Sequence, residues 1–356
     1  DFLTCLPIEQ ARGNVGQSFN LLANLGLVSR YRGEYTKALE YYEQGIEICK
    51  RMNYTDAYAS ILGNMSSVYR RQGRIDEALS HAKVAWRIRQ ELFAQGKIDE
   101  VSVGLTLHLL GQAYLEAGKY NEAERSFDRV YDIYLRNNYK IGFPVVFNRY
   151  GQLNLSSGKL EVAQEWFKRA VELSEGVNSE QYINSLNRLG RICLKREQWR
   201  EAIALFEQAI AAAVPVPDYY QQVENKLDLA DAVSRIGDYE KSQQLFAEAE
   251  AMARVENYVQ FLAQVEQRQA ELEYRRGEYH EAFRHYALYC QRLAEYNHTA
   301  FIAAVQYIVD VLLDIPRSQV AQVVQDLKSY WTELQLNEKY PELVQAIEEI
   351  DSLMLP

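Results

Sequence analysis

The chain has 356 residues, enough for two or three compact domains or for one long array of repeats. Hydrophobic residues make up 48% and charged residues 25%, which excludes a wholly disordered chain. The net charge of −10 disfavours binding to the phosphate backbone of nucleic acids. No apolar run approaches the ~18 residues of a membrane span, and the four scattered cysteines indicate a reducing, cytoplasmic compartment.

A short phrase, Gly-x-Tyr-x-x-Ala, recurs along the chain and first appears at Gly33, Tyr35 and Ala38. An aliphatic residue or Trp sometimes replaces the Tyr, Glu197 replaces the glycine once, and Ser242 replaces the alanine once. Such regular recurrence is the mark of a repeat architecture. The aromatic or aliphatic positions, 39 to 45 residues apart, are Tyr35, Ile75, Tyr120, Leu160, Trp199, Tyr239 and Tyr279.

Apolar residues on both sides of each phrase recur in steps of three and four, as Leu107, Leu110 and Ala113 do before the third phrase. This spacing is typical of amphipathic helices, so each period is predicted to be a helix, a turn and a second helix. A helix pair alone exposes an apolar face, which stacking on the next pair buries. The predicted pairs span residues 15–54, 55–98, 99–138, 139–178, 179–217, 218–257 and 258–297.

The combined pattern resembles the tetratricopeptide repeat (TPR). The residues that carry the resemblance in the third pair are Leu110, Gly111, Tyr114, Gly118, Tyr120, Ala123 and Phe127. The resemblance implies an all-α, right-handed superhelical solenoid of about seven repeats, followed by C-terminal capping helices. A standard TPR has about 34 residues, whereas these repeats have about 40 and resemble those of kinesin light chain and of the sensor arms of bacterial signal-transduction ATPases. HEAT repeats share the period but lack the turn phrase, and they rank second.

One position in the first helix of each pair is always small. The two helices of a pair are expected to approach most closely there. The residues at this position are Gly26, Ser66, Gly111, Gly151, Gly190, Ala230 and Ala270.

The two ends of the chain lack the full repeat pattern. Residues 1–14 are predicted to be a linker or the remnant of a preceding repeat, and a chain that begins with Asp1 suggests a piece of a longer protein. Residues 298–356 are predicted to form capping helices, with a break at Asp314-Ile315-Pro316 and a last, acidic helix from Tyr340 to Leu353. A docking tail for a basic partner is the alternative for that acidic end.

No catalytic or metal-binding motif is present in the sequence. It contains no HExxH, no phosphate-binding loop of the GxxxxGK[ST] type and no GxSxG. The five histidines are expected at the surface, and Cys193 is expected in the core. We therefore expect no enzyme activity, no metal and no cofactor.

The TPR resemblance implies that the first helix of each pair lines a concave groove that holds a partner. Asn amides can both donate to and accept from a peptide backbone, and Arg and Lys attract carboxylates. In the sixth repeat the sign reverses, with Glu224, Asp228 and Asp231. The competing interpretation is an ordinary solvated helix face. The candidate groove residues are Asn20, Asn24, Asn64, Arg71, Asn148, Arg149, Asn184, Asn187, Arg188, Arg191, Lys195 and Asp228.

The expected function is that of a non-catalytic module that binds a protein or peptide in the groove, as the sensor or scaffold arm of a larger bacterial signalling protein. In that case a nucleotide-binding domain would precede these repeats in the full-length protein, and the ligand could also be a small inducer. The alternatives are a free-standing adaptor that bridges two protein partners and, third, an enzyme with an unrecognised site. Neither a nucleic acid nor a membrane is expected as a partner.

Overall fold

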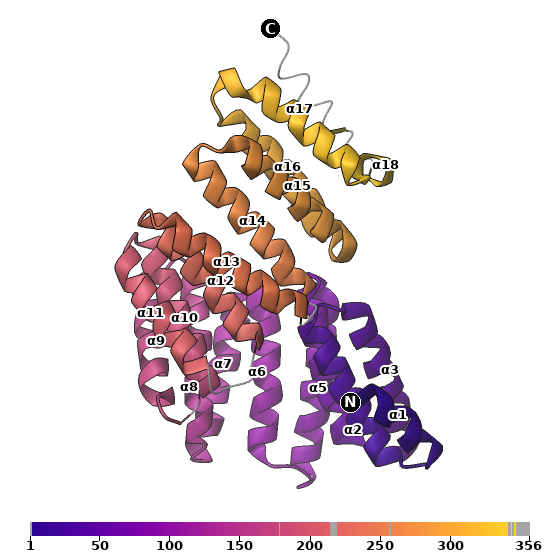
Figure 1. The fold of residues 1–356 in the computed structure, drawn as a ribbon. Helices are drawn as coiled ribbons and strands as arrows, with labels where there is room; N and C mark the ends of the chain where they lie inside the picture. Colours follow the sequence, from indigo (N-terminus) through magenta and orange to yellow (C-terminus); the bar gives the residue numbers. More distant parts are fainter. Residues whose placement is uncertain are drawn as a thin grey trace. The chain divides into compact units, whose positions relative to one another are not determined.

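A computed structural model describes residues 2–177, 179–213, 219–255 and 258–340, together with residues 343, 345 and 346. In these residues the regular secondary structure is helical and includes no strand (Figure 1), which confirms the predicted all-α solenoid of helix pairs. The helices form two compact units: residues 1–196 with 211–216, and residues 197–210 with 217–356.

The first unit begins with a single helix and continues with helix pairs. In each complete pair the two helices pack against each other along their lengths. The helices are α1 (Phe2–Ala11), α2 (Val15–Tyr31), α3 (Tyr35–Met52), α4 (Thr55–Arg71), α5 (Ile75–Ala94), α6 (Glu100–Glu116), α7 (Tyr120–Arg136), a 3-10 turn (Lys140–Gly142), α8 (Phe143–Ser156), α9 (Leu160–Ser174) and α10 (Ser179–Lys195).

The second unit takes in residues 199–210 of α11 (Trp199–Ala213) and two complete helix pairs, followed by the C-terminal helices. These elements are α12 (Tyr219–Arg235), α13 (Tyr239–Val255), α14 (Val259–Arg276), α15 (Tyr279–Tyr296), α16 (His298–Leu313), α17 (Arg317–Glu333) and α18 (Leu336–Lys339).

The small-residue position is where the two helices of a pair meet most closely. A Cβ atom added to Gly111 would lie 2.6 Å from a ring carbon of Phe127, and one added to Gly151 would lie 2.6 Å from Phe167. Both distances are shorter than carbon–carbon contact allows, so a side chain at either glycine would displace the ring. The close approach predicted from the sequence is therefore present.

Where serine replaces glycine or alanine in this contact, its hydroxyl bridges the pair. Ser66 Oγ donates to the carbonyl oxygen of Ala78 at 2.8 Å, and Ser242 Oγ donates to the carbonyl of Ala230 at 2.8 Å. Both serines are fully buried, and these hydrogen bonds offset the cost of burying their hydroxyl groups. The repeat residues that follow each turn are all inaccessible to solvent: Ala38, Ala78, Ala123, Ala163, Ala202, Ser242 and Ala282.

The turn between the two helices requires a left-handed backbone residue. Six of the turns place glycine there, with φ between 69° and 86°: Gly33, Gly73, Gly118, Gly158, Gly237 and Gly277. In the fifth repeat Glu197 adopts the same conformation, with φ of 60°. A residue with a Cβ atom is strained in this region, because Cβ approaches its own carbonyl oxygen.

The C-terminal helices cover the last helix pair. Both α16 and α17 pack on α15, and Phe301, Val323 and Trp331 join a core that includes Phe283 of α15. As expected, the first of these helices ends before Asp314. Most of the acidic helix predicted over residues 340–353 lies outside the described residues.

At the other end, residues 2–11 form α1, and Leu6 of this helix packs against Leu22 and Leu25 of α2. The interpretation of residues 1–14 as a linker or as the remnant of a preceding repeat stays a prediction.

Glu197→Gly is expected to stabilise the protein by up to ~1 kcal/mol. Relief of the left-handed strain is worth about 1–2 kcal/mol, and the greater freedom of glycine in the unfolded chain returns about 0.4–1 kcal/mol of it. The midpoint of thermal unfolding measures the change. The matched control is Gly158→Glu, which introduces the same strain at a turn with open space around it and should lower the midpoint. An unchanged midpoint in both variants would contradict the strain argument.

Gly111→Leu is expected to lower the free energy of unfolding by roughly 1–3 kcal/mol, because it overpacks the contact with Phe127. Gly16→Leu serves as the control, since a Cβ atom at Gly16 has no neighbour within 4 Å. Urea unfolding of both variants gives the comparison. Equal stability of the two variants would show that the helices do not meet at Gly111.

Candidate functional site

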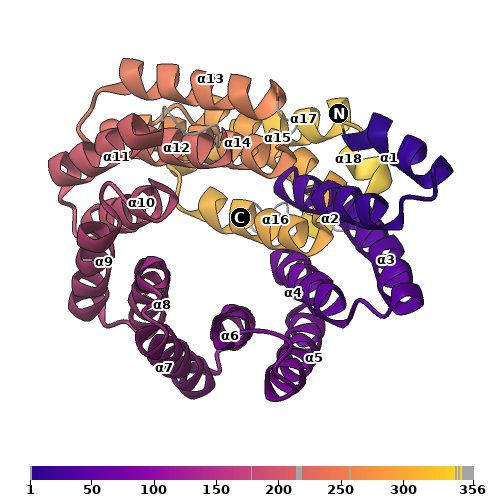
Figure 2. The ribbon, with the colours of Figure 1, turned by 90° about the horizontal axis from the view of Figure 1, so that it is seen from below.

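The helices of the first unit form two rows. In Figure 2, α4, α6 and α8 lie on the inner side of an arc, and α5, α7 and α9 lie on the outer side. The inner row consists of the first helices of the pairs, because their apolar faces pack on the second helices and on the neighbouring pairs. Their remaining polar faces form the surface of the arc.

Most of the predicted groove residues keep accessible surface. Asn20 and Asn24 on α2 are exposed, as is Arg71 on α4, whereas Asn64 is partly exposed. On α10, Asn184, Arg188 and Arg191 are partly exposed, and Lys195 at the end of the helix is exposed.

Three of the predicted groove residues are buried: Asn148, Asn187 and Asp228. Asn148 links α8 to α10, because its amide donates to Gln181 Oε1 at 3.0 Å and accepts from Ser185 Oγ at 3.0 Å. A buried amide with both of its functional groups engaged fixes the spacing of the two helices. Asp228 is 2% exposed and accepts a hydrogen bond from Arg268 at 2.7 Å.

Polar contacts between first helices join residues about one repeat apart. Arg70 at the end of α4 donates to Gln112 Oε1 at 2.7 Å and to Glu116 at 2.6 Å, both on α6. Arg149 Nε of α8 donates to His108 Nε2 of α6 at 2.9 Å, and Arg149 Nη1 donates to Gln152 Oε1 of its own helix at 3.1 Å.

His108 therefore differs from the sequence-based expectation, since it is buried and only 9% exposed. Burial and the positive charges of Arg149 and Arg70 lower the pKa of His108 well below its ordinary value. The imidazole is neutral at physiological pH, and Nε2 is the acceptor because a guanidinium only donates.

Arg149 keeps part of its accessible surface, yet the surrounding protein removes much of the water from its guanidinium. This desolvation, together with repulsion from Arg70 and Arg188, lowers the pKa of Arg149 to about 9. The side chain still carries its charge at neutral pH. Arg149 on α8 is thus a cation whose hydrogen-bond acceptors, His108 and Gln152, are both neutral.

Two of the three acids of α12, Asp228 and Asp231, have arginine partners within the second unit. Asp228 pairs with Arg268, and Asp231 pairs with Arg275 at 3.1 Å, both from α14. The sequence predicts a change of sign along the groove here. For Asp228 and Asp231 the contacts show that the charge is largely neutralised by the next helix pair, at separations of 40 and 44 residues.

Glu271 on α14 differs from these ion-paired acids of the second unit, because its charged form is disfavoured in the folded protein. Desolvation, followed by repulsion from Asp231, raises the pKa of Glu271 above its ordinary value, although Arg268 and Arg275 oppose the shift. Its carboxylate accepts a hydrogen bond from Gln267 at 3.1 Å.

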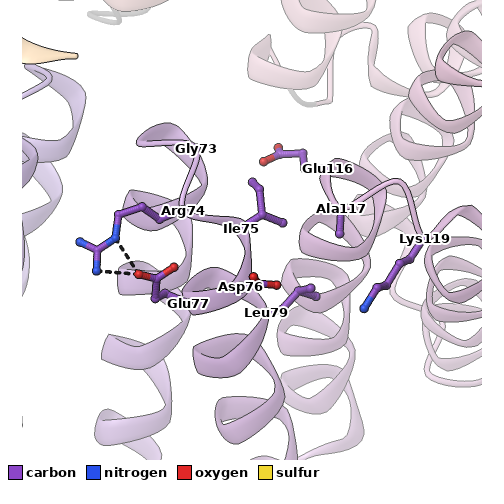
Figure 3. A pocket seen from close by; sticks show the side chains of 9 residues that line it. All are labelled: Gly73, Arg74, Ile75, Asp76, Glu77, Leu79, Glu116, Ala117 and Lys119. Carbon is purple, nitrogen blue, oxygen red and sulfur yellow. Dashed lines mark hydrogen bonds and ion pairs between the residues drawn. The ribbon is translucent and has the colours of Figure 1, made fainter. Parts of the chain in front are cut away.

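A pocket of about 480 Å³ lies beside the turns that end α4 and α6. Figure 3 shows that its charged side chains come from both turns and that Arg74 pairs with Glu77, at 2.8 Å. The predicted groove residues do not line this pocket. Its mixed and partly self-paired charges give no indication of a particular ligand.

The described residues contain no group of His, Cys, Asp or Glu side chains that could hold a metal ion. A helix long and apolar enough to cross a membrane is likewise absent from the part of the chain that the structure describes.

Comparison with protein families matches a tetratricopeptide-repeat model to residues 17–91, 144–213 and 181–255, which together make up more than half of the chain. A second tetratricopeptide-repeat model matches residues 108–178. The chain belongs to the tetratricopeptide-repeat family. The TPR pattern recognised in the sequence is thereby confirmed, and the family identifies the chain as a protein-interaction module.

Among curated proteins, the outer dynein arm-docking complex subunit 4 of Danio rerio is 27% identical over 157 residues, which cover 43% of this TPR chain and 30% of that protein. The match thus spans less than a third of the relative. A solved signal-transduction ATPase with numerous domains, which has a TPR sensor and comes from Pyrococcus horikoshii, aligns at 13% identity with a TM-score of 0.57. The alignment covers 95% of this chain and 53% of that one.

The Rap conjugation gene regulator of the plasmid pLS20, solved in complex with the Phr* peptide, aligns at 14% identity with a TM-score of 0.58. This alignment covers 90% of this TPR chain and 79% of the regulator. At such identities the structural likenesses establish the shared fold alone.

Glu271→Gln is expected to raise the melting temperature at neutral pH. The raised pKa means that the ionised carboxylate destabilises the folded state whenever the pH exceeds its unfolded pKa of about 4.3. The gain over the wild type should shrink as the pH falls through that value and vanish well below it, where the carboxyl is neutral in both the folded and the unfolded state. Glu273→Gln is the control, since Glu273 is ion-paired to Arg276 at 2.7 Å and loss of that pair should not raise the melting temperature. A gain independent of pH would contradict the assignment.

Proposed function

We propose that this TPR chain is a non-catalytic module that binds a protein or peptide on the inner face of its first helices, as the sensor or scaffold arm of a larger bacterial signalling or regulatory protein. The observation that carries the proposal is the exposure of polar and cationic side chains on the first helices. Asn64, Asn184 and Arg188, which are predicted to line that face, are partly exposed, and Lys195 is exposed.

These residue types suit an extended peptide. Asn side chains can pair with both the N–H and the C=O of a backbone, and guanidinium groups bind carboxylates with two parallel hydrogen bonds. The likeness in fold to a regulator solved with a peptide, and to an ATPase with a TPR sensor, supports a sensory role. The same likeness supports a nucleotide-binding domain elsewhere in the full-length protein.

The ligand could equally be a small inducer, since an inner face of this kind also accommodates compact polar molecules. A cytoplasmic location fits the proposal. The alternative is a free-standing adaptor that bridges two protein partners. The sequence of the complete gene separates the two, because a sensor arm requires an effector domain in the same polypeptide, whereas an adaptor does not.

The test begins with a random-sequence peptide library displayed against the protein. Peptides that bind the wild type are then measured by fluorescence anisotropy against Arg188→Glu/Arg191→Glu/Lys195→Glu. We expect at least a tenfold loss of affinity, because each charged hydrogen bond removed is worth ~1.5–3 kcal/mol.

The matched control reverses three exposed cations on the second helices of the first unit: Arg125, Lys168 and Arg169. This variant carries the same change in net charge and should keep wild-type affinity. Equal losses in both variants would indicate non-specific electrostatic attraction. Unchanged affinity in the first variant, with an intact fold, would remove the α10 residues from the site.

A further inference from the structure

Arg149 occupies a repeat position with an informative counterpart. It lies two residues before the small residue Gly151, and Arg268 lies two residues before the small residue Ala270. Arg268 pairs with Asp228, which holds the same position in the preceding helix pair. For Arg149 the residue at the corresponding position of the preceding pair is Leu109, which offers no charge.

Arg149 has no acidic partner in the part of the chain that the structure describes. No carboxylate there lies within ion-pair distance of its guanidinium, which donates to His108 and Gln152. Two other enclosed arginines of the first unit do have one, since Arg89 pairs with Asp56 at 2.9 Å and Arg70 with Glu116 at 2.6 Å. A desolvated cation without a counter-charge is costly, so the arrangement calls for an explanation.

The local field adds to this excess of positive charge. Arg70, Arg71 and Arg188 all repel the Arg149 charge, and Glu116 opposes them. The carboxylate of Glu116 is already bound to Arg70. The charge balance around Arg149 therefore remains positive.

Arg70 and Arg149 approach adjacent turns of α6. Arg70 binds Gln112 and Arg149 binds His108, four residues earlier on the same face, which corresponds to a rise of ~6 Å along the helix. Arg70 Nε is buried and has no hydrogen-bond partner in the part of the chain that the structure describes. A donor left in this state is rare in folded proteins.

His108 and Gln152 hold the Arg149 guanidinium without cancelling its charge. They accept hydrogen bonds from Nε and Nη1, so the remaining N–H groups of the guanidinium can donate to a ligand. Because the side chain is already oriented, little rotamer entropy is lost on binding.

The geometry points to a subsite for an oxyanion, a carboxylate or a phosphate, at Arg149 with Arg70 beside it. This inference rests on the proposed function in that the oxyanion belongs to the ligand held on the inner face. Because His108 is a neutral acceptor, the subsite stays cationic. A carboxylate at position 108 would pair with Arg149 and take the place of the ligand's oxyanion.

The experiment measures thermal unfolding of the whole chain in sodium acetate, in inorganic phosphate and in chloride at equal ionic strength and pH. Phosphate stabilises most proteins without a site, so the informative quantity is the difference between variants. The wild type should gain more melting temperature from acetate or phosphate than Arg149→Gln does. Gain from acetate alone identifies a carboxylate site, and gain from phosphate alone identifies a phosphate site.

Substitution of the histidine gives the sharper test. His108→Gln preserves a neutral acceptor and should retain the oxyanion-dependent shift, whereas His108→Glu supplies an internal carboxylate and should abolish it. Arg136→Gln, which removes an exposed arginine paired with Glu100, is the charge-matched control and should behave as the wild type does. If His108→Glu does not fold, the oxyanion-dependent shift of Arg149→Gln compared with that of the wild type tests the subsite.

Two results would overturn the subsite: an oxyanion shift in Arg149→Gln equal to that of the wild type, or a full shift retained in folded His108→Glu. Library peptides give the independent measure of the proposed function. Peptides that bind the inner face but lose no affinity in Arg149→Gln would leave the module standing and refute the subsite. An oxyanion shift without any bound peptide would refute peptide binding and leave the subsite standing. Amidated and acid-free versions of a bound peptide distinguish a C-terminal carboxylate from a side chain.

Discussion

The close approach of two helices at one residue in each pair is the contact on which the rest of this fold depends. At Gly111 and Gly151 an aromatic ring from the second helix occupies the space that a side chain would need. Where a hydroxyl replaces hydrogen there, as in Ser66, it must donate to the facing backbone. Locking the apolar faces together in this way leaves the polar face of each first helix without a helix to cover it. The inner face of the first unit is thus a consequence of the packing.

The same packing sets which charges can meet. First helices of consecutive pairs lie side by side, so a residue finds its partner about one repeat away: 41 residues for Arg149 and His108, 40 for Arg268 and Asp228. With an acid at that distance the arginine is neutralised and stabilises the stack. With a neutral imidazole it is oriented but keeps its charge. The neighbouring repeat therefore decides whether an arginine is neutralised, as Arg268 is, or keeps its charge, as Arg149 does.

The local features of this fold could be predicted from the sequence, because each depends on residues that are close together in the chain. Turn glycines, small residues and apolar spacing identify helices and their closest contacts, and Glu197 shows that the pattern holds even where the preferred residue is absent. The pairing of Arg268 with Asp228 could have been found by comparing equal repeat positions. The contact between Arg149 and His108 could not, since the histidine is offset by one residue from the equivalent position, and only the packed helices show which side chain turns towards the arginine.

Buried amides are the other limit of the sequence pattern. Asn148 and Asn184 lie on neighbouring first helices and look alike in sequence, but the first is enclosed between α8 and α10 and the second retains accessible surface.

Contacts between first helices also determine how a bound ligand would affect the stack. In a solenoid each pair is stabilised chiefly by its immediate neighbours. Because α4 and α8 both pack on α6, an oxyanion held by Arg70 and Arg149 would join the first helices of three consecutive pairs. Binding there would restrain their relative rotation, a mechanical response that no single pair could supply.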